Sequence, residues 1–143
     1  MSEVLARTSR QGPATPDTVD ALHEDFAVLW QQAGFVPELD RMAFSTAVIE
    51  AATNVVRHAL PASATPLELG VDITIRACRL EAHISEIGAA PSAPPLGAAP
   101  EDLGDGAESG RGLALIRALV STITFERRGE DNLWVLAREP SGH

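Results

Sequence analysis

The sequence predicts an α+β domain built as a two-layer sandwich, with helices on one face of a mixed, mostly antiparallel sheet. Two stretches of helical periodicity, 16–33 and 40–60, come first, and paired stretches of alternating hydrophobicity follow them. Helical and strand patterns therefore occur in runs rather than in strict alternation, which favours α+β over a parallel α/β fold. The length of 143 residues suits a single domain, 1–143, around one core.

The N-terminal half is expected to hold one strand and two helices. Residues 3–8 have the composition of a short edge strand. The first helix should begin near Pro16, because proline is favoured in the first helical turn, and run to about Ala33. For the second helix, Asp40 is the candidate N-cap, and the helix should stop at Pro61.

The C-terminal half is expected to supply most of the sheet. Residues 67–77 and 79–86 alternate in part and predict two antiparallel strands joined by a tight turn. A third apolar helix is expected at 112–120, followed by a closing hairpin around Gly129. The segment 89–110 between them is rich in Pro, Gly and Ala, and loops of that length are usually functional or disordered.

Composition excludes several classes of protein. The net charge of −9 argues against a nucleic-acid binder and against docking on anionic lipid. With one cysteine, Cys78, an internal disulfide is impossible, so a cytoplasmic location is expected. No stretch approaches the roughly 20 apolar residues of a membrane span, so no membrane association is expected.

The first candidate for chemistry is the helical stretch EAATNVVRHAL, residues 50–60. Glu50, Asn54 and His58 are spaced i, i+4, i+8, and Arg57 falls in the same arc. An ordinary solvated face is one interpretation. The composition speaks mildly against it, because such faces usually carry better helix formers than Asn and His.

A second candidate is ESGRGLALIRALV, where Gly110 and Gly112 flank Arg111 as the long loop becomes a helix. A helix N-terminus presents free N–H groups, and glycines let a phosphate approach the backbone. A flexible loop end is the alternative. Neither a P-loop nor a Rossmann fingerprint is present.

The third candidate is HISEIGAAP, residues 83–91, where a predicted strand ends in Glu86 followed by Gly88. A carboxylate at a strand end can accept a hydrogen bond from the exocyclic amine of a base, and a nearby glycine lets the ring lie against the backbone. A solvated glutamate at the exit of a strand is the alternative.

Taken in this order, the three segments resemble the N, G1 and G2 boxes of the GHKL ATPase superfamily, whose ATP-binding domain is the Bergerat fold. The resemblance covers about residues 14–138, and the G1 segment is its weakest part. The wordings EAxxNxxRHA and GRGLxLIRxLV resemble one branch in particular, the anti-sigma factor serine/threonine kinases of bacterial partner-switching systems.

The resemblance implies ATP and Mg²⁺ as cofactors and assigns roles to named residues. Asn54 would coordinate Mg²⁺, Glu50 would be the catalytic general base, and 89–110 would form the ATP lid. Glu86 and Ala90 depart from the usual Asp and Gly of the G1 box. The full set of cofactor-binding positions that the resemblance implies is Asn54, Arg57, His58, Glu86, Gly88, Ala90, Gly110, Arg111, Gly112 and Leu113.

The partners that the resemblance implies are a sigma factor, held inactive by a homodimer of this chain, and an anti-sigma factor antagonist of the STAS type, phosphorylated on a serine or threonine. A second hypothesis is a partner-binding module with the same fold and without phosphoryl transfer, favoured by the altered G1 box. A sensor-kinase ATPase domain is a third and weaker one, because no helical phosphoacceptor region or F-box is recognisable.

Overall fold

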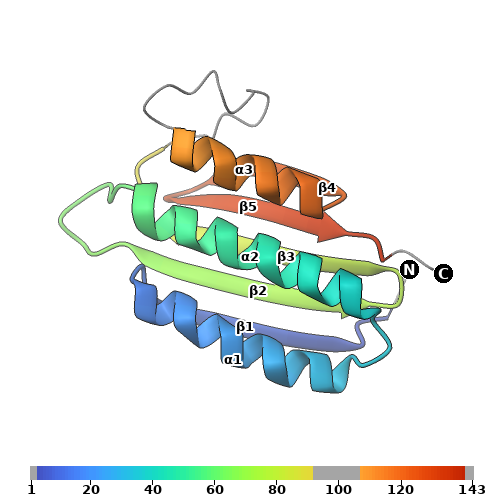
Figure 1. Cartoon of the computed structure of the whole chain (residues 1–143). Coiled ribbons are helices and arrows are strands. Elements are labelled where there is room, and N and C mark those ends of the chain that lie inside the picture. The colour runs from blue at the N-terminus through green and yellow to red at the C-terminus, as the bar shows by residue number, and fades with distance from the viewer. Residues whose placement is uncertain (1–2, 92–106, 141–143) are drawn as a thin grey trace.

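Three helices lie on one face of a five-stranded sheet (Figure 1). The computed structural model describes residues 3–91 and 107–140, with side chains described for all of these except 107–111. The sheet order is β1-β2-β3-β5-β4, and each neighbouring pair is antiparallel. The predicted two-layer α+β class is therefore confirmed, in its antiparallel form. The elements are β1 (Ala6–Pro13), α1 (Pro16–Gln32), α2 (Glu38–His58), β2 (Glu68–Arg76), β3 (Arg79–Ile87), α3 (Ala107–Leu119), β4 (Thr122–Arg128) and β5 (Asp131–Arg138).

The helix α1 covers the β1 side of the sheet. It starts at Pro16, whose fixed φ suits the first turn, and buries a stripe formed by Leu22, Phe26 and Leu29. None of the described helices is both long and apolar enough to cross a lipid bilayer.

The central helix α2 lies close to the sheet because its inner face is built largely from alanine. Ala47 and Ala51 are fully buried, and Phe44 fills the space toward α1. There, the Phe44 ring meets Phe26 edge-on, and Phe26 stacks on Trp30 with centroids 5.8 Å apart. This aromatic cluster fixes α1 against α2.

Two predicted boundaries differ from the structure. The first strand spans Ala6–Pro13 instead of 3–8, since its register is decided by pairing with β2, where Ala6 faces Ile75 and Pro13 faces Glu68. The third helix begins at Ala107 rather than at 112. Gly110 and Gly112 therefore lie inside the helix and do not start it.

The predicted N-cap role of Asp40 is wrong. The helix begins at Glu38 after Pro37, with no side-chain cap, and Asp40 is fully buried. Its carboxylate accepts a hydrogen bond from Arg138 Nε at 2.8 Å, while Arg138 also donates to the Leu119 carbonyl at 2.6 Å. This ion pair therefore joins the start of α2 to the ends of α3 and β5.

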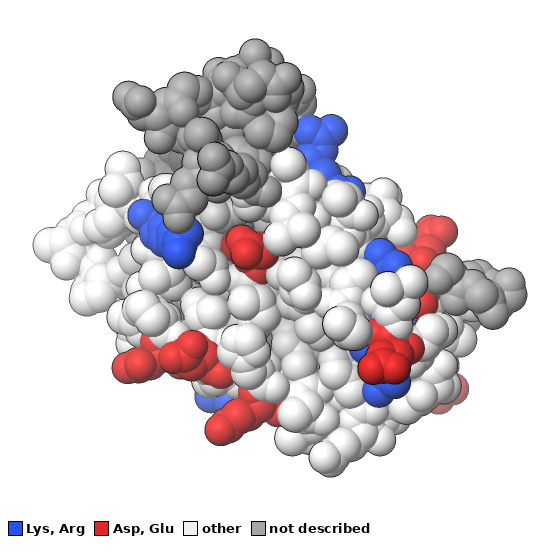
Figure 2. All heavy atoms as spheres, viewed as in Figure 1, with Lys and Arg blue, Asp and Glu red and all other residues white. Residues whose placement is uncertain are grey.

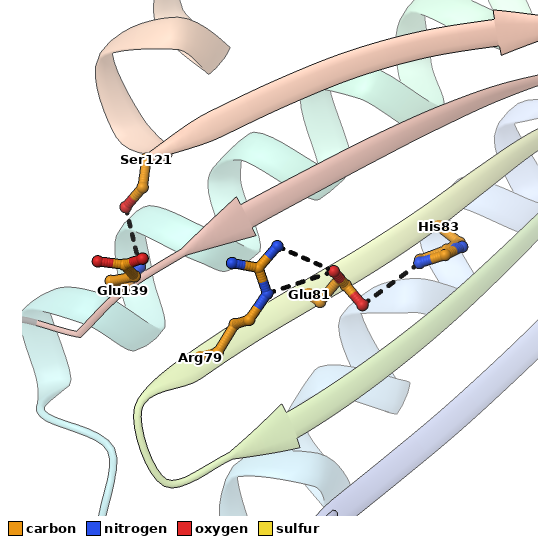
Figure 3. Close-up of polar contacts among 5 residues, drawn as sticks. All are labelled: Arg79, Glu81, His83, Ser121 and Glu139. Carbon is orange, nitrogen blue, oxygen red and sulfur yellow. Dashed lines mark hydrogen bonds and ion pairs between the residues drawn. The ribbon is translucent and has the colours of Figure 1, made fainter. Parts of the chain in front are cut away.

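On the face of the sheet opposite the helices, β3 carries a polar row formed by Arg79, Glu81 and His83 (Figure 3). Burial raises the pKa of Glu81, but the hydrogen bonds from Arg79 and His83 outweigh burial, so this pKa lies below its ordinary value. The contribution of ionised Glu81 to the stability of the fold is therefore fully present when the pH is above the ordinary pKa of glutamate. It is lost as the pH falls through the lowered pKa of Glu81. Nearby, the Glu139 N–H donates to Ser121 Oγ at 2.9 Å, which closes the end of the β4–β5 hairpin.

Replacing Asp40 by Asn should lower the free energy of unfolding by about 3 kcal/mol, because Arg138 would keep a largely buried charge without its counterion. Urea unfolding followed by circular dichroism measures the change. As a control, Glu126→Gln removes the acid of an exposed pair with Arg128 and should cost no more than about 0.5 kcal/mol. Equal losses in the two variants would contradict the structural role of the buried pair.

Candidate functional site

The closest meeting of α2 and α3 brings together residues from the first and second candidate segments. A Cβ atom added to Gly112 would lie 3.3 Å from Asn54 Nδ2 and 3.4 Å from both Asn54 Oδ1 and Glu50 Oε2. A side chain at this position would make the two polar side chains shift by a few tenths of an ångström, so glycine favours the close approach of α3. Glu50, Asn54 and Gly112 therefore form one cluster, called here the α2–α3 cluster.

Asn54 is not on a wet helix face. It is 7% exposed, whereas Arg57 and His58, in the same arc and one turn further on, are exposed. The interpretation of this stretch as an ordinary solvated face therefore fails at Asn54. A buried amide beside a carboxylate and an open backbone is a donor set that suits a hard cation with phosphate oxygens.

The glycines of α3 act differently from the expectation. Because the helix starts at Ala107, Gly112 lies in its second turn and its N–H is not one of the four free groups of the helix start. Its contribution is the close approach to α2. Gly110 and Arg111 lie in the first turns of α3, where only the backbone is described. Residues 92–106 of the expected lid fall outside the described residues. Leu113 is 5% exposed in the core, which leaves only its backbone for a phosphate.

The structure buries the Glu86 side chain, so the alternative of a solvated glutamate at the exit of the strand is wrong. Its side chain is on the helix-covered face of the sheet and is 4% exposed. Trp134 Nε1 donates to Glu86 Oε2 at 2.6 Å, and Asn132 Nδ2 donates to Glu86 Oε1 at 2.9 Å. Both carboxylate oxygens thus accept hydrogen bonds from β5.

The turn after Glu86 is bonded to the same hairpin. Asn132 Nδ2 also donates to the Ala90 carbonyl at 2.9 Å. Arg127 donates to the Ala89 carbonyl at 2.6 Å and to Asn132 Oδ1 at 3.1 Å. We call this set of bonds between the segment Glu86–Ala90 and the β4–β5 hairpin the hairpin staple.

Gly88 completes the hairpin staple in a backbone conformation that favours glycine, with φ of +76°. Its N–H donates to Asp131 Oδ1 at 3.1 Å. Its carbonyl accepts from the Ala62 N–H at 2.9 Å, and the Ala90 N–H donates to the Leu60 carbonyl at 2.7 Å. The turn is therefore held from β5 on one side and from the loop after α2 on the other.

Sequence reasoning missed the four hairpin residues that form the hairpin staple. Only the register between β3 and β5 relates these residues to Glu86. In that register Glu86 pairs with Asn132, and Trp134 is two residues further along the same face of β5. Without knowing that β3 pairs with β5, nothing in the local sequence connects these residues. They are Arg127, Asp131, Asn132 and Trp134.

A cavity of about 490 Å³ runs between α1 and α2 on the outer side of the helices and reaches Glu50. The helical face that contains it shows a broad uncharged area, with charged groups mostly toward its margins (Figure 2). In the cavity wall, Arg41 Nε is buried and has no hydrogen-bond partner within the described residues. The lining residues are His23, Phe26, Trp30, Glu38, Arg41, Met42, Ser45, Thr46, Ile49 and Glu50.

The two ends of the candidate site offer different groups to Mg-ATP. The α2–α3 cluster fits the metal end, since it offers an amide oxygen and a carboxylate side by side. Within the described ranges no three His, Cys, Asp or Glu side chains gather as a metal site, so Asn54 would share the ion with phosphate oxygens and water. At the base end, each Glu86 oxygen accepts one hydrogen bond from β5 and keeps a further acceptor position.

Comparison with known proteins gives one family. The sequence profile described as "Histidine kinase-like ATPase domain" matches residues 12–138. No curated protein matches the chain. Among solved structures, the chain is similar to the Acinetobacter baumannii histidine kinase AdeS, with 18% identity and a TM-score of 0.47 over 94% of this chain and 68% of that chain.

Replacing Gly112 by Ala should fail to give the stabilisation of about 1 kcal/mol that Gly-to-Ala changes give inside helices, because the new methyl group would press on Asn54 and Glu50. Urea unfolding tests this. Gly34→Ala, in the turn after α1, is the control for an unobstructed site: a Cβ there meets only the Trp30 carbonyl at 3.9 Å, and the change should stabilise the fold by about 0.4–1 kcal/mol through the unfolded chain. If Gly112→Ala stabilised the fold by the full amount, α3 would not approach α2 as the structure shows.

Proposed function

Because the chain belongs to the histidine kinase-like ATPase domain family, we propose that it is an ATP-dependent protein serine kinase that also acts as an anti-sigma factor. In this proposal a homodimer sequesters a sigma factor and phosphorylates a STAS-type antagonist of that sequestration. The observation that carries the kinase part is the α2–α3 cluster, which places a carboxylate, an amide and a glycine backbone within one site.

Each member of the α2–α3 cluster has a distinct task in the proposed reaction. Bound Mg-ATP supplies the phosphoryl group and the metal charge that offsets its oxygens. Asn54 would give the metal an amide oxygen, and Gly112 lets α3 lie against Asn54 and Glu50. Glu50 orients the serine hydroxyl of the substrate and accepts its proton, while positioning and electrostatics supply most of the rate.

The cavity between α1 and α2 supports a protein as the substrate. It reaches Glu50, so a chain segment lying in it would end beside the proposed base. Its wall combines aromatic rings with the unpartnered Nε of Arg41, and Met42 beside them is 62% exposed. An apolar segment lying in the cavity would cover the methionine and the aromatic rings.

The second candidate function is a partner-binding module that keeps the fold without catalysis. One observation favours it: Glu86, the acid expected to bind adenine, is bonded to Trp134 and Asn132 inside the protein. A chain that had lost nucleotide binding would be free to use this carboxylate for stability. Whether Mg-ATP binds at all separates the two candidates.

Asn54→Ala should weaken Mg-ATP binding by about tenfold or more, because a metal ligand is removed from a site with few protein ligands. Isothermal titration with and without Mg²⁺ measures the loss. Thr53→Ala is the control, since the Thr53 hydroxyl donates to the Ile49 carbonyl of its own helix at 2.7 Å. An unchanged affinity in Asn54→Ala would remove the metal assignment.

Glu50→Gln should keep Mg-ATP affinity and lower phosphoryl transfer by about 100-fold or more, because the amide can hold the hydroxyl but cannot take its proton. The measurement is transfer of radiolabelled phosphate to STAS-domain proteins of the same genome. Glu38→Gln, which changes another acid of the cavity, should transfer at the wild-type rate. A full rate in Glu50→Gln would exclude Glu50 as the base, and transfer absent from the wild type would favour the partner-binding module.

A further inference from the structure

We propose that Trp134 and Asn132 are positioning residues for a carboxylate that reads the base: they hold Glu86 so that its remaining acceptor positions meet the exocyclic amine of adenine. This inference rests on the proposed nucleotide-binding function and assigns the selectivity for adenine to two residues of β5. Three observations carry it: the two hydrogen bonds on Glu86, the packing that fixes their donors, and the place of Glu86 in the fold.

The first observation is the way in which Glu86 is held. Trp134 Nε1 donates to Oε2 at 2.6 Å and Asn132 Nδ2 donates to Oε1 at 2.9 Å, so both oxygens are bound from the same neighbouring strand. An ionised carboxylate has about four acceptor positions, so about two remain. Because a glutamate has more side-chain freedom to lose than a shorter acid, these two bonds select one position for its carboxylate.

The remaining acceptor positions of Glu86 suit an amine. An ionised carboxylate accepts hydrogen bonds and donates none. Adenine presents an exocyclic amine where guanine presents a carbonyl, so a fixed acceptor at this position favours adenine. The selectivity depends on the direction in which the free positions point, and that direction is set by the two donors of β5.

The second observation is that both donors are themselves fixed. Trp134 is 4% exposed, and its ring meets Phe125 edge-on with centroids 5.6 Å apart. Asn132 is fully buried, its Oδ1 accepts from Arg127 at 3.1 Å, and its Nδ2 also donates to the Ala90 carbonyl at 2.9 Å. A group that binds a ligand precisely needs neighbours whose own rotamers are locked by packing and hydrogen bonds. Trp134 and Asn132 meet that condition.

The third observation is the place of Glu86 in the fold. Its side chain is on the face of the sheet that the helices cover, and the turn after it is bonded at Gly88 and Ala90 to the loop that follows α2. Asn54 lies about one turn before the end of α2. The end of α2, the start of α3 and the segment after β3 lie at one end of the molecule (Figure 1). Glu86 and Asn54 are thus at the same end of the fold, as the base and the metal of one nucleotide require.

A buried glutamate that serves stability alone is the alternative to a positioned one. Removing one of its donors would then weaken the fold and lower the affinity for all nucleotides alike. Positioning predicts a loss confined to ligands that carry the amine. ATP and purine riboside triphosphate separate the two cases, because they differ only in the replacement of the amine by hydrogen.

The experiment is isothermal titration of the full chain with the Mg²⁺ complexes of ATP and of purine riboside triphosphate. The wild type should bind ATP at least about tenfold more tightly, as expected for a hydrogen bond to a charged group. Trp134→Phe keeps an aromatic ring and removes the N–H. In this variant the ratio should fall to about threefold or less, while the affinity for purine riboside triphosphate changes by less than about threefold. Asn132→Ser, which removes the other donor, should lower the ratio in the same way.

Ile123→Val is the matched control, because it trims a partly buried side chain of the same hairpin and leaves every bond of the hairpin staple in place. It should lower the thermal unfolding midpoint and keep the wild-type ratio. A wild-type ratio within about threefold, or a ratio that keeps its wild-type value in Trp134→Phe and Asn132→Ser, would overturn the positioning role and leave the proposed kinase intact. Absence of ATP binding in the wild type would overturn both proposals. Should one of the two variants not fold, the other decides.

Discussion

The distance between α2 and α3 at Gly112 is the constraint on which the candidate site depends. A single methyl group there would lie 3.3–3.4 Å from the polar atoms of Asn54 and Glu50, so the absence of a side chain is what lets the two helices meet. The same close approach contributes to the burial of Asn54, which is 7% exposed. Gly112 thus links the packing of α3 on α2 to the positions of the two polar side chains of the candidate site.

A second constraint acts at the other end of the site. The hairpin staple fixes the Glu86–Ala90 turn through side chains of β4 and β5, in a network where each buried acceptor has a donor. A satisfied buried network is costly to open, because any donor left behind loses its partner in a region of low dielectric. The Glu86–Ala90 turn is therefore expected to be rigid.

The sequence was sufficient for the fold class and for the order of the elements, because long apolar periodicities and the Gly129 turn are local signals. The positions of Glu50, Asn54 and Gly112 in one cluster were also expected, although only from a resemblance between separated segments. What could not be predicted depends on strand register. The bond from Trp134 to Glu86, like the burial of Asp40 against Arg138, joins residues far apart in the chain and changes the role of an acid that looks solvated in isolation.

A crystal structure of the chain with Mg²⁺ and a non-hydrolysable ATP analogue would test the central claim most directly. The account predicts a metal ion bound by the Asn54 amide oxygen, phosphates beside the Gly112 backbone, and Glu86 still bonded to Trp134 and Asn132. An analogue that occupies no position next to Asn54 at saturating concentration would contradict it.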